Sequence, residues 1–297
     1  MADRVLDSSV LRIGGRSGAL LAMTALGGLV MFCWPLFVRI GPGGTGHTTD
    51  APFLFILVLP MLVAIVLASF SEGGMDSKAL AMLGVLSAVN AALRPLGAGL
   101  AGIETVFFLL VLAGRVFGPG FGFVLGCTSI FASALLTAGV GPWLPFQMLA
   151  SAWIGLGAGL LPRGVRGRAE IAMLAGYGVF AAYGFGLLMN LWYWPFAVGA
   201  GTSISFVPGD PVLDNAYRFL VYTLTPSTLG WATGRAITNA IAIVAFGPAV
   251  LATLRRASRR ASFGAPVTYA EPEPEPDPEP VPPGGTTSTR LHGPAGR

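Results

Sequence analysis

The chain has 297 residues, of which 54% are hydrophobic and only 11% are charged. A soluble domain carries about 25% charged residues, so this composition predicts an integral membrane protein and excludes a soluble enzyme. The net charge of +4 does not indicate a nucleic-acid partner, because the arginines flank apolar segments and form no basic stripe.

Apolar runs separated by helix-breaking residues predict an all-α protein with about eight transmembrane helices. These helices cover residues 17–38, 52–70, 79–93, 104–117, 120–139, 145–161, 169–191 and 229–254. The first run is too long for the apolar region of a signal peptide and no A-x-A cleavage site follows it, so we expect a retained helix. The third and fourth runs are short, which suits helices packed beside an irregular loop at residues 94–103.

The placement of basic residues predicts the orientation in the membrane. Eight spans put both termini on one side, and twelve Lys and Arg then fall in connections on that side against three on the other. Because basic residues favour cytoplasmic loops, we expect both termini to be cytoplasmic in a multi-pass protein of the plasma (inner) membrane. After the last helix, residues 257–297 are rich in acid and proline, which predicts a disordered cytoplasmic tail.

The sequence offers little for catalysis. It contains no HExxH, GxSxG or GxxxxGK[ST] motif, and its two histidines, His47 and His292, lie outside the predicted helices. Cys33 and Cys127 lie within apolar runs, where thiols are usually packing residues. We therefore expect no catalytic residue, metal site or cofactor, and any energy for the protein's work has to come from a partner.

Polar residues near the outer ends of the predicted helices form the candidate site. Arg235 lies about 9 Å into the last helix, where a charge is costly and marks a functional site by default. Snorkelling to the outer headgroups is the alternative interpretation. Glu104 is the nearest candidate partner, and Arg94 lies in the same outer loop. Gln147, Asn190 and Asn239, within apolar spans, either orient a ligand or hydrogen-bond between helices.

Five of the six tryptophans map to the outer side, although an aromatic belt normally marks both membrane interfaces. This one-sided placement indicates an external cavity, with belt residues as the alternative. On the third predicted helix, Gly84, Ala88 and Ala92 recur at four-residue spacing, which makes a smooth stripe for close helix approach.

Residues 105–162 resemble the core of the substrate-binding S components of energy-coupling factor (ECF) vitamin importers. The resemblance rests on FGPGFGF at 117–123, GPWLPFQM at 141–148 and GLGAGLLP at 155–162. It extends over about residues 78–254, which contain six predicted helices, the number that the family uses. It divides the chain into an N-terminal region with two additional helices (1–77), a six-helix S-component-like core (78–256) and the tail (257–297).

The resemblance implies a protein that captures a vitamin outside and works with a transmembrane coupling protein and two ATP-binding subunits. It implies that Gly84, Ala88 and Ala92 face the coupling protein and that outer halves of later helices bind the substrate. The residues expected to contribute are Arg94, Glu104, Trp143, Gln147, Asn190, Trp192, Tyr193, Trp231 and Arg235. The subgroup it most resembles is associated with cobalamin or has no assigned substrate, so cobalamin is the favoured vitamin.

Two other functions compete with this expectation. A solitary secondary transporter for a small organic solute commonly has an ionisable relay at mid-depth and two related halves, and neither is recognisable in the sequence. A membrane scaffold or prenyl-lipid enzyme is a third interpretation, but the Asp-rich metal motifs that such chemistry needs are missing.

Overall fold

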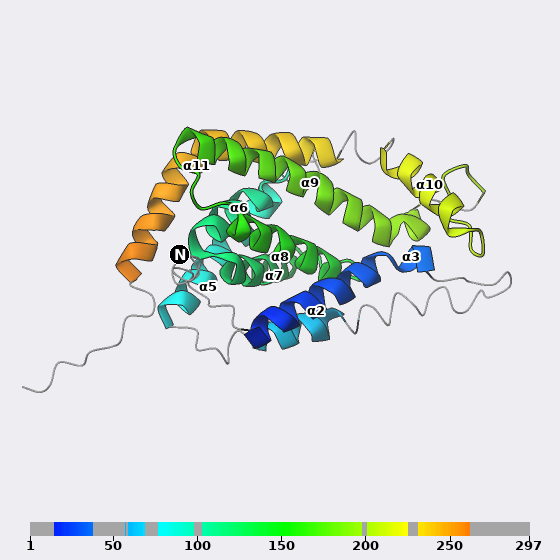
Figure 1. The fold of residues 1–297 in the computed structure, drawn as a ribbon, viewed down its shortest axis with the longest axis horizontal. Coiled ribbons are helices and arrows are strands. Elements are labelled where there is room, and N and C mark those ends of the chain that lie inside the picture. The colour runs from blue at the N-terminus through cyan, green and yellow to red at the C-terminus, as the bar shows by residue number, and fades with distance from the viewer. Residues whose placement is uncertain are drawn as a thin grey trace, which may run out of the picture. The chain divides into compact units, whose positions relative to one another are not determined.

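The structure is a computed structural model that describes residues 15–37, 57, 59–68, 77–97, 103–197, 201–224 and 231–261. Every regular element in these ranges is a helix, which confirms the predicted all-α class for this part of the chain (Figure 1). The predicted tail lies outside the described residues except for 257–261, which belong to the last helix.

Most of the helices follow the predicted runs within a few residues, and the last two long helices continue beyond them. The first run forms α2 (Gly15–Phe32) and the short α3 (Trp34–Phe37), and the second is described as a helix at Leu59–Ala68. The remaining elements are α5 (Ser77–Leu93), the 3-10 helix η1 (Arg94–Gly97), α6 (Val106–Phe117), α7 (Pro119–Leu136), α8 (Leu144–Leu160), α9 (Arg168–Ala197), α10 (Val212–Tyr222) and α11 (Thr233–Ala261).

Three described helices are long and apolar enough to cross a membrane: Pro119–Leu136, Arg168–Pro195 and Thr233–Ala261. The other apolar helices have 10–17 residues. At 1.5 Å per residue, the 12 residues of α6 extend about 18 Å, less than the roughly 30 Å of a hydrocarbon core. Large apolar side chains such as Phe180, Ile241 and Phe246 are more than half exposed, as expected of surfaces that face lipid.

Helix α7 occupies the middle of the core and contacts α5, α6 and α8. Its backbone approaches that of α8 so closely that a Cβ atom on Gly122 or Gly155 would overlap the carbonyl oxygen of the other residue. Small residues permit this approach, and dispersion contacts between the two helices then stabilise the pair without a hydrophobic driving force from water.

The turn between α6 and α7 consists of one residue, Gly118. Its φ of 95° lies in the region that side chains disfavour, and Pro119 starts the next helix where its missing N–H has no partner to lose. The FGPGFGF sequence is therefore a helix–turn–helix connection that fixes the entry of α7 into the core.

The connection between the last two predicted spans differs from expectation. The helix predicted at residues 169–191 continues in the structure to Ala197 as α9, and the connection that follows contains a further helix, α10. Asn215 is buried and exchanges hydrogen bonds with the backbone of Val207, and Phe219 packs against Trp194. Contacts with residues outside α10 stabilise this helix, which lies between the long apolar runs, so the pattern of those runs did not reveal it.

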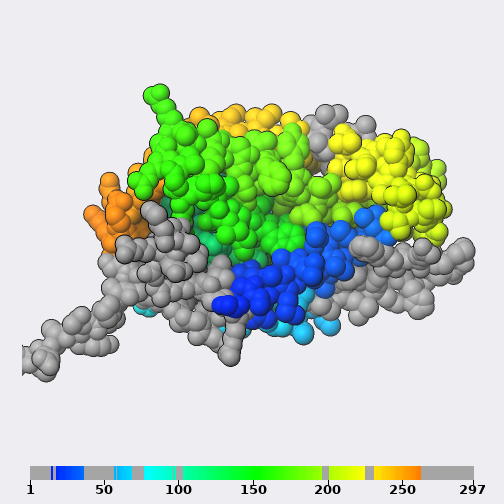
Figure 2. All heavy atoms as spheres, viewed as in Figure 1, coloured from blue at the N-terminus to red at the C-terminus, as the bar shows by residue number. Residues whose placement is uncertain are grey.

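The N-terminal helix α2 lies against α8 and α9. Phe32 packs on Phe146 and Trp153 of α8, with ring centroids 5.1 and 5.7 Å apart. The space-filling view shows α2 in blue lying against the green atoms of the core helices (Figure 2). This first additional helix thus shares the hydrophobic core of the following ones.

Candidate functional site

The candidate site is centred on an ion pair between Arg235 of α11 and Glu104, which lies two residues before the start of α6. The Nε–H of Arg235 donates to Oε2 of Glu104 at 2.5 Å, and the two side chains are only 11% and 18% exposed. A charged pair this far removed from water interacts more strongly than one on the surface, because the surrounding dielectric constant is lower.

A second guanidinium shares the same carboxylate. Nε of Arg94, in η1, lies 3.9 Å from Oε1 of Glu104, and Nη2 of Arg94 donates to Oε1 of Gln147 at 2.8 Å. The side chain of Arg94 is 20% exposed. Residues from η1, the start of α6, the first turn of α8 and the first turn of α11 are therefore joined in one polar network. The two guanidiniums and one carboxylate leave it with one excess positive charge.

Aromatic rings hold the Arg235 guanidinium in place. Its Cζ atom lies 4.8 Å from the ring centroid of Phe185 and 5.7 Å from that of Phe107. The two rings are themselves in contact, with centroids 5.0 Å apart, and both are buried. Stacking on aromatic faces favours the planar guanidinium over the flexible ammonium of lysine.

Asn239, one turn further along α11, fixes the backbone around the ion pair. Its Nδ2 donates to the carbonyl oxygens of both Glu104 and Arg235, at 2.7 and 2.9 Å. The side chain is fully buried, and its Oδ1 accepts no hydrogen bond from the described residues. Such an oxygen is costly to bury unless a donor reaches it, so a water molecule or ligand group is expected there.

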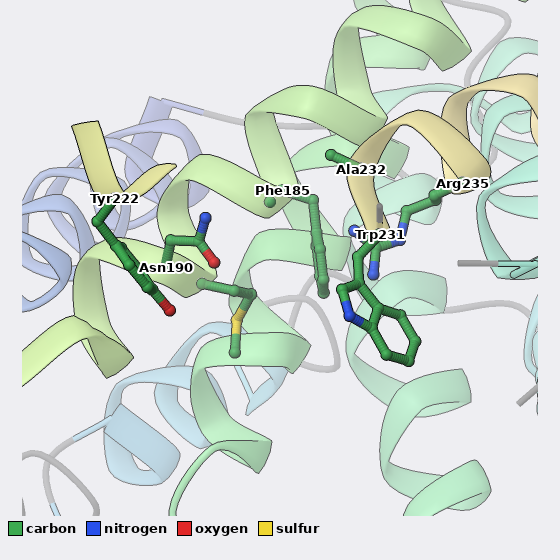
Figure 3. A pocket seen from close by; sticks show the side chains of 8 residues that line it. Phe185, Asn190, Tyr222, Trp231, Ala232 and Arg235 are labelled. Atoms are coloured by element: carbon green, nitrogen blue, oxygen red, sulfur yellow. The ribbon is translucent and has the colours of Figure 1, made fainter. Parts of the chain in front are cut away.

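A cavity of about 340 Å³ opens beside this network. The side chains that define its chemistry are Phe185, Met189, Asn190, Tyr222, Trp231 and Arg235. Tyr222 and Asn190 lie on one side, Trp231 and Arg235 on the other, and Phe185 between them (Figure 3). Apolar and aromatic walls with a few polar groups are typical of small-molecule sites, and the volume is near the lower end of their range.

The chemistry of the cavity suits an anionic ligand with a flat, unsaturated ring. Arg235 provides a guanidinium at the wall, and Trp231 and Phe185 provide aromatic faces. Burial, and secondarily the negative charge of ionised Tyr193, raise the pKa of Tyr222 above its ordinary value. A tyrosine hydroxyl is protonated at neutral pH, so that of Tyr222 can donate a hydrogen bond to a ligand.

The nine residues expected to bind substrate fall into three groups. Asn190, Trp231 and Arg235 line the cavity, and Arg94, Glu104 and Gln147 belong to the polar network that contains Arg235. The others, Trp143, Trp192 and Tyr193, do not line the cavity in the part of the chain that the structure describes.

The positions of those three residues differ. Trp143 is 41% exposed and donates its indole N–H to the carbonyl oxygen of Gly139 at 3.2 Å. Trp192 is buried against Phe146, with ring centroids 4.7 Å apart, and stacks on the exposed Tyr193. Trp192 thus contributes to the core between α8 and α9.

The sequence did not reveal the apolar and aromatic residues that helix packing brings to the site. Phe107, Phe185 and Met189 are apolar residues within apolar runs, and nothing in their spacing separates them from ordinary core positions. Tyr222 lies at the end of α10, a helix that was not predicted. Asn239, in contrast, was recognised from the sequence as a polar residue within an apolar run.

The small-residue stripe lies on the exposed face of α5. Gly84, Ala88 and Ala92 are all exposed, and a Cβ atom on Gly84 would have no neighbour within 4 Å. The opposite face of α5 is fixed to α7 by a hydrogen bond between the hydroxyls of Ser87 and Thr128 and by one from Asn90 to Ser129. The stripe is therefore accessible in the isolated chain.

In the ranges that the structure describes, no group of three or more His, Cys, Asp or Glu side chains is arranged to hold a metal ion. A scan against protein-family models, a search of curated proteins and a search of solved structures each found no match for this chain.

Proposed function

We propose that this chain is the substrate-binding S component of an ECF-type importer, which captures a vitamin or related micronutrient at the outer face of the plasma membrane. The observation that supports this most is the convergence of Arg94, Glu104, Gln147 and Arg235 beside a cavity with aromatic walls. A buried charge is expensive in a membrane helix, and a binding role accounts for retaining it.

The proposal includes the membrane topology predicted from the sequence. Eight spans with both termini in the cytoplasm place the Arg235 network and its cavity at the outer ends of α6 and α11. The chain itself is a binding protein without catalysis, and ATP hydrolysis in two partner subunits drives import through a transmembrane coupling protein.

The cavity favours a ligand smaller than a corrinoid. At about 340 Å³ it accommodates a compact ring system, whereas cobalamin is a macrocycle with a bulky nucleotide arm. A vitamin with a carboxylate and a flat unsaturated ring matches the guanidinium and the aromatic walls, and cobalamin serves as the comparison ligand.

Contact with the coupling protein is assigned to the exposed stripe of α5. Gly84, Ala88 and Ala92 present no large side chain, so a second helix can approach closely. The hydrogen bonds of Ser87 and Asn90 to α7 hold this face outward.

The test is a mild-detergent purification of the tagged chain from its native membrane, followed by mass spectrometry of the proteins and small molecules retained. We expect a coupling protein, two ATP-binding subunits and a vitamin. If folded protein is recovered alone while a control complex survives the same procedure, the proposal is wrong.

The competing permease is tested separately with the pure chain in liposomes. Proton- or sodium-dependent uptake of a small organic solute by the chain alone identifies a secondary transporter. We expect no uptake without the partner subunits.

A further inference from the structure

We propose that a second, arginine-lined cavity at the opposite end of α6 and α11 binds the phosphate group of an anionic membrane lipid. This site is separate from the vitamin cavity and does not depend on the function proposed for it, although it shares with that proposal the predicted orientation of the helices. Three features support the proposal: the buried ion pair between Arg115 and Glu170, a bend in α11 and the many arginines in the cavity wall.

The site is built around Arg115, the one charged residue of α6. The side chain of Arg115 is buried. Its Nε–H donates to Oε1 of Glu170 at 2.7 Å. Its remaining nitrogens donate to the carbonyl oxygens of Leu161, Pro162 and Val165, each at 3.0 Å. Arg115 therefore fixes the connection between α8 and α9. Its N–H groups already donate hydrogen bonds within the protein, so its role at the site is structural.

Arg255 completes this arrangement from α11. Its Nη2 donates to the same Glu170 oxygen at 2.6 Å, although Arg255 is 42% exposed whereas Glu170 is only 3% exposed. Helix α11 contains Pro248, and Figure 1 shows the helix turning sharply in its orange part. Proline removes a helical hydrogen bond and bends the chain, which brings the last turns of α11 over the start of α9.

These elements surround a cavity of about 510 Å³. Among the described residues, the charged ones that line it are Arg115, Arg163, Arg166, Glu170, Arg255 and Arg259. In this part of the chain five guanidiniums and one carboxylate line the cavity, and Arg115 and Arg255 both bind that carboxylate. The wall also includes the hydroxyl of Ser258, a further hydrogen-bond donor.

Phosphate is the anion that this wall suits best. Guanidinium groups bind phosphate oxygens in pairs of parallel hydrogen bonds, and several arginines together match its multiple oxygens. Because basic residues favour the cytoplasmic side of a membrane, we expect this end of α6 and α11 at the cytoplasmic leaflet. Basic cavities between membrane helices bind the headgroups of anionic lipids on that side. Leu160, one residue before the Leu161 carbonyl oxygen that Arg115 binds, has an apolar side chain that is 65% exposed. An acyl chain of a bound lipid can contact this side chain, whereas a free phosphate compound cannot.

The test uses the full chain purified into detergent and examined by native mass spectrometry during titration with phosphatidylglycerol or phosphatidylcholine. In parallel, inorganic phosphate and glycerol phosphate are titrated calorimetrically. The variants are Arg166→Gln, in the connection between α8 and α9, and Arg255→Gln, which leaves Glu170 paired with Arg115. The matched control is Arg256→Gln, which removes the same charge from an exposed neighbouring position that does not line the cavity.

We expect phosphatidylglycerol to bind more tightly than phosphatidylcholine and each cavity variant to weaken it roughly fivefold, as expected for one arginine at an anionic surface. The control should change little. If glycerol phosphate binds equally well with the same response to the variants, the phosphate site stands and its source is soluble, which overturns the lipid assignment. Equal losses in Arg166→Gln and Arg256→Gln would show only diffuse surface charge and overturn the site. Equal binding of phosphatidylglycerol and phosphatidylcholine would show that the charge of the headgroup is not recognised, which also overturns it.

Discussion

Arg235 donates its Nε–H to the carboxylate of Glu104, a residue 131 positions earlier in the chain. The contact connects the first turn of α11 to the start of α6, and the two backbones are joined again through Asn239. Arg94 adds a second positive charge at 3.9 Å from the same carboxylate. This carboxylate both holds the helices together and limits the positive charge offered to a ligand.

Glu104→Gln should lower the thermal stability of the purified chain. The two guanidiniums lose the carboxylate that they share, and breaking a buried ion pair costs about 3–5 kcal/mol. Because these side chains are partly exposed, we expect about 1–3 kcal/mol. The measurement is thermal unfolding in detergent.

The control for this variant is Asp210→Asn. It breaks the more exposed pair between Asp210 and Arg218, whose side chains are 34% and 24% exposed. An exposed pair contributes about 0–1 kcal/mol, so the melting temperature should shift less. Equal shifts in the two variants contradict a structural role for the buried network.

Gly155→Ala should destabilise the fold, whereas Gly84→Ala should not. A methyl group on Gly155 meets the Gly122 backbone of α7, and overpacking of this kind costs about 1–3 kcal/mol. Gly84 has open space around it, and alanine in a helix is favoured over glycine by roughly 0.5–1 kcal/mol. Thermal unfolding of both variants measures the difference, and a stable Gly155→Ala protein refutes the close packing of α7 and α8.

Trp231→Ala should reduce the amount of vitamin that co-purifies with the chain by about tenfold or more. Trp231 lines the cavity beside Arg235, and truncation of a central aromatic contact commonly costs about 2 kcal/mol or more. Trp143→Ala is the matched control, because Trp143 lies outside the cavity. Quantitative mass spectrometry of the retained small molecule distinguishes the two, and the reverse order of effects would reject this cavity as the binding site.

Ala88→Phe should prevent recovery of the coupling protein while leaving the chain folded. A large side chain on the exposed stripe of α5 blocks close helix approach without entering the core. The control is Ile241→Phe, which enlarges an exposed apolar position on α11. The amount of partner protein recovered per folded chain is the readout, and normal recovery with Ala88→Phe excludes this face from the interface.

The sequence alone established that the protein is helical and suited to a membrane. Long apolar runs with few charges specify helices, because a helix satisfies its own backbone hydrogen bonds wherever it lies. For the same reason the boundaries of α5, α7 and α8 lie within a few residues of those predicted. Arg235 also stood out at once, because a charge in an apolar helix is conspicuous without knowledge of its neighbours.

Only the tertiary structure decided which residues meet. Glu104, Arg94 and Gln147 reach the same place from three elements, and α10 forms because Asn215 and Phe219 find partners in other parts of the chain. Phe107 and Phe185 become part of the site only because α6, α9 and α11 bring their rings to the Arg235 guanidinium. Residue spacing encodes the geometry of one helix, whereas contacts between helices depend on the packing of the whole core, in which each side chain's partners are distant in sequence.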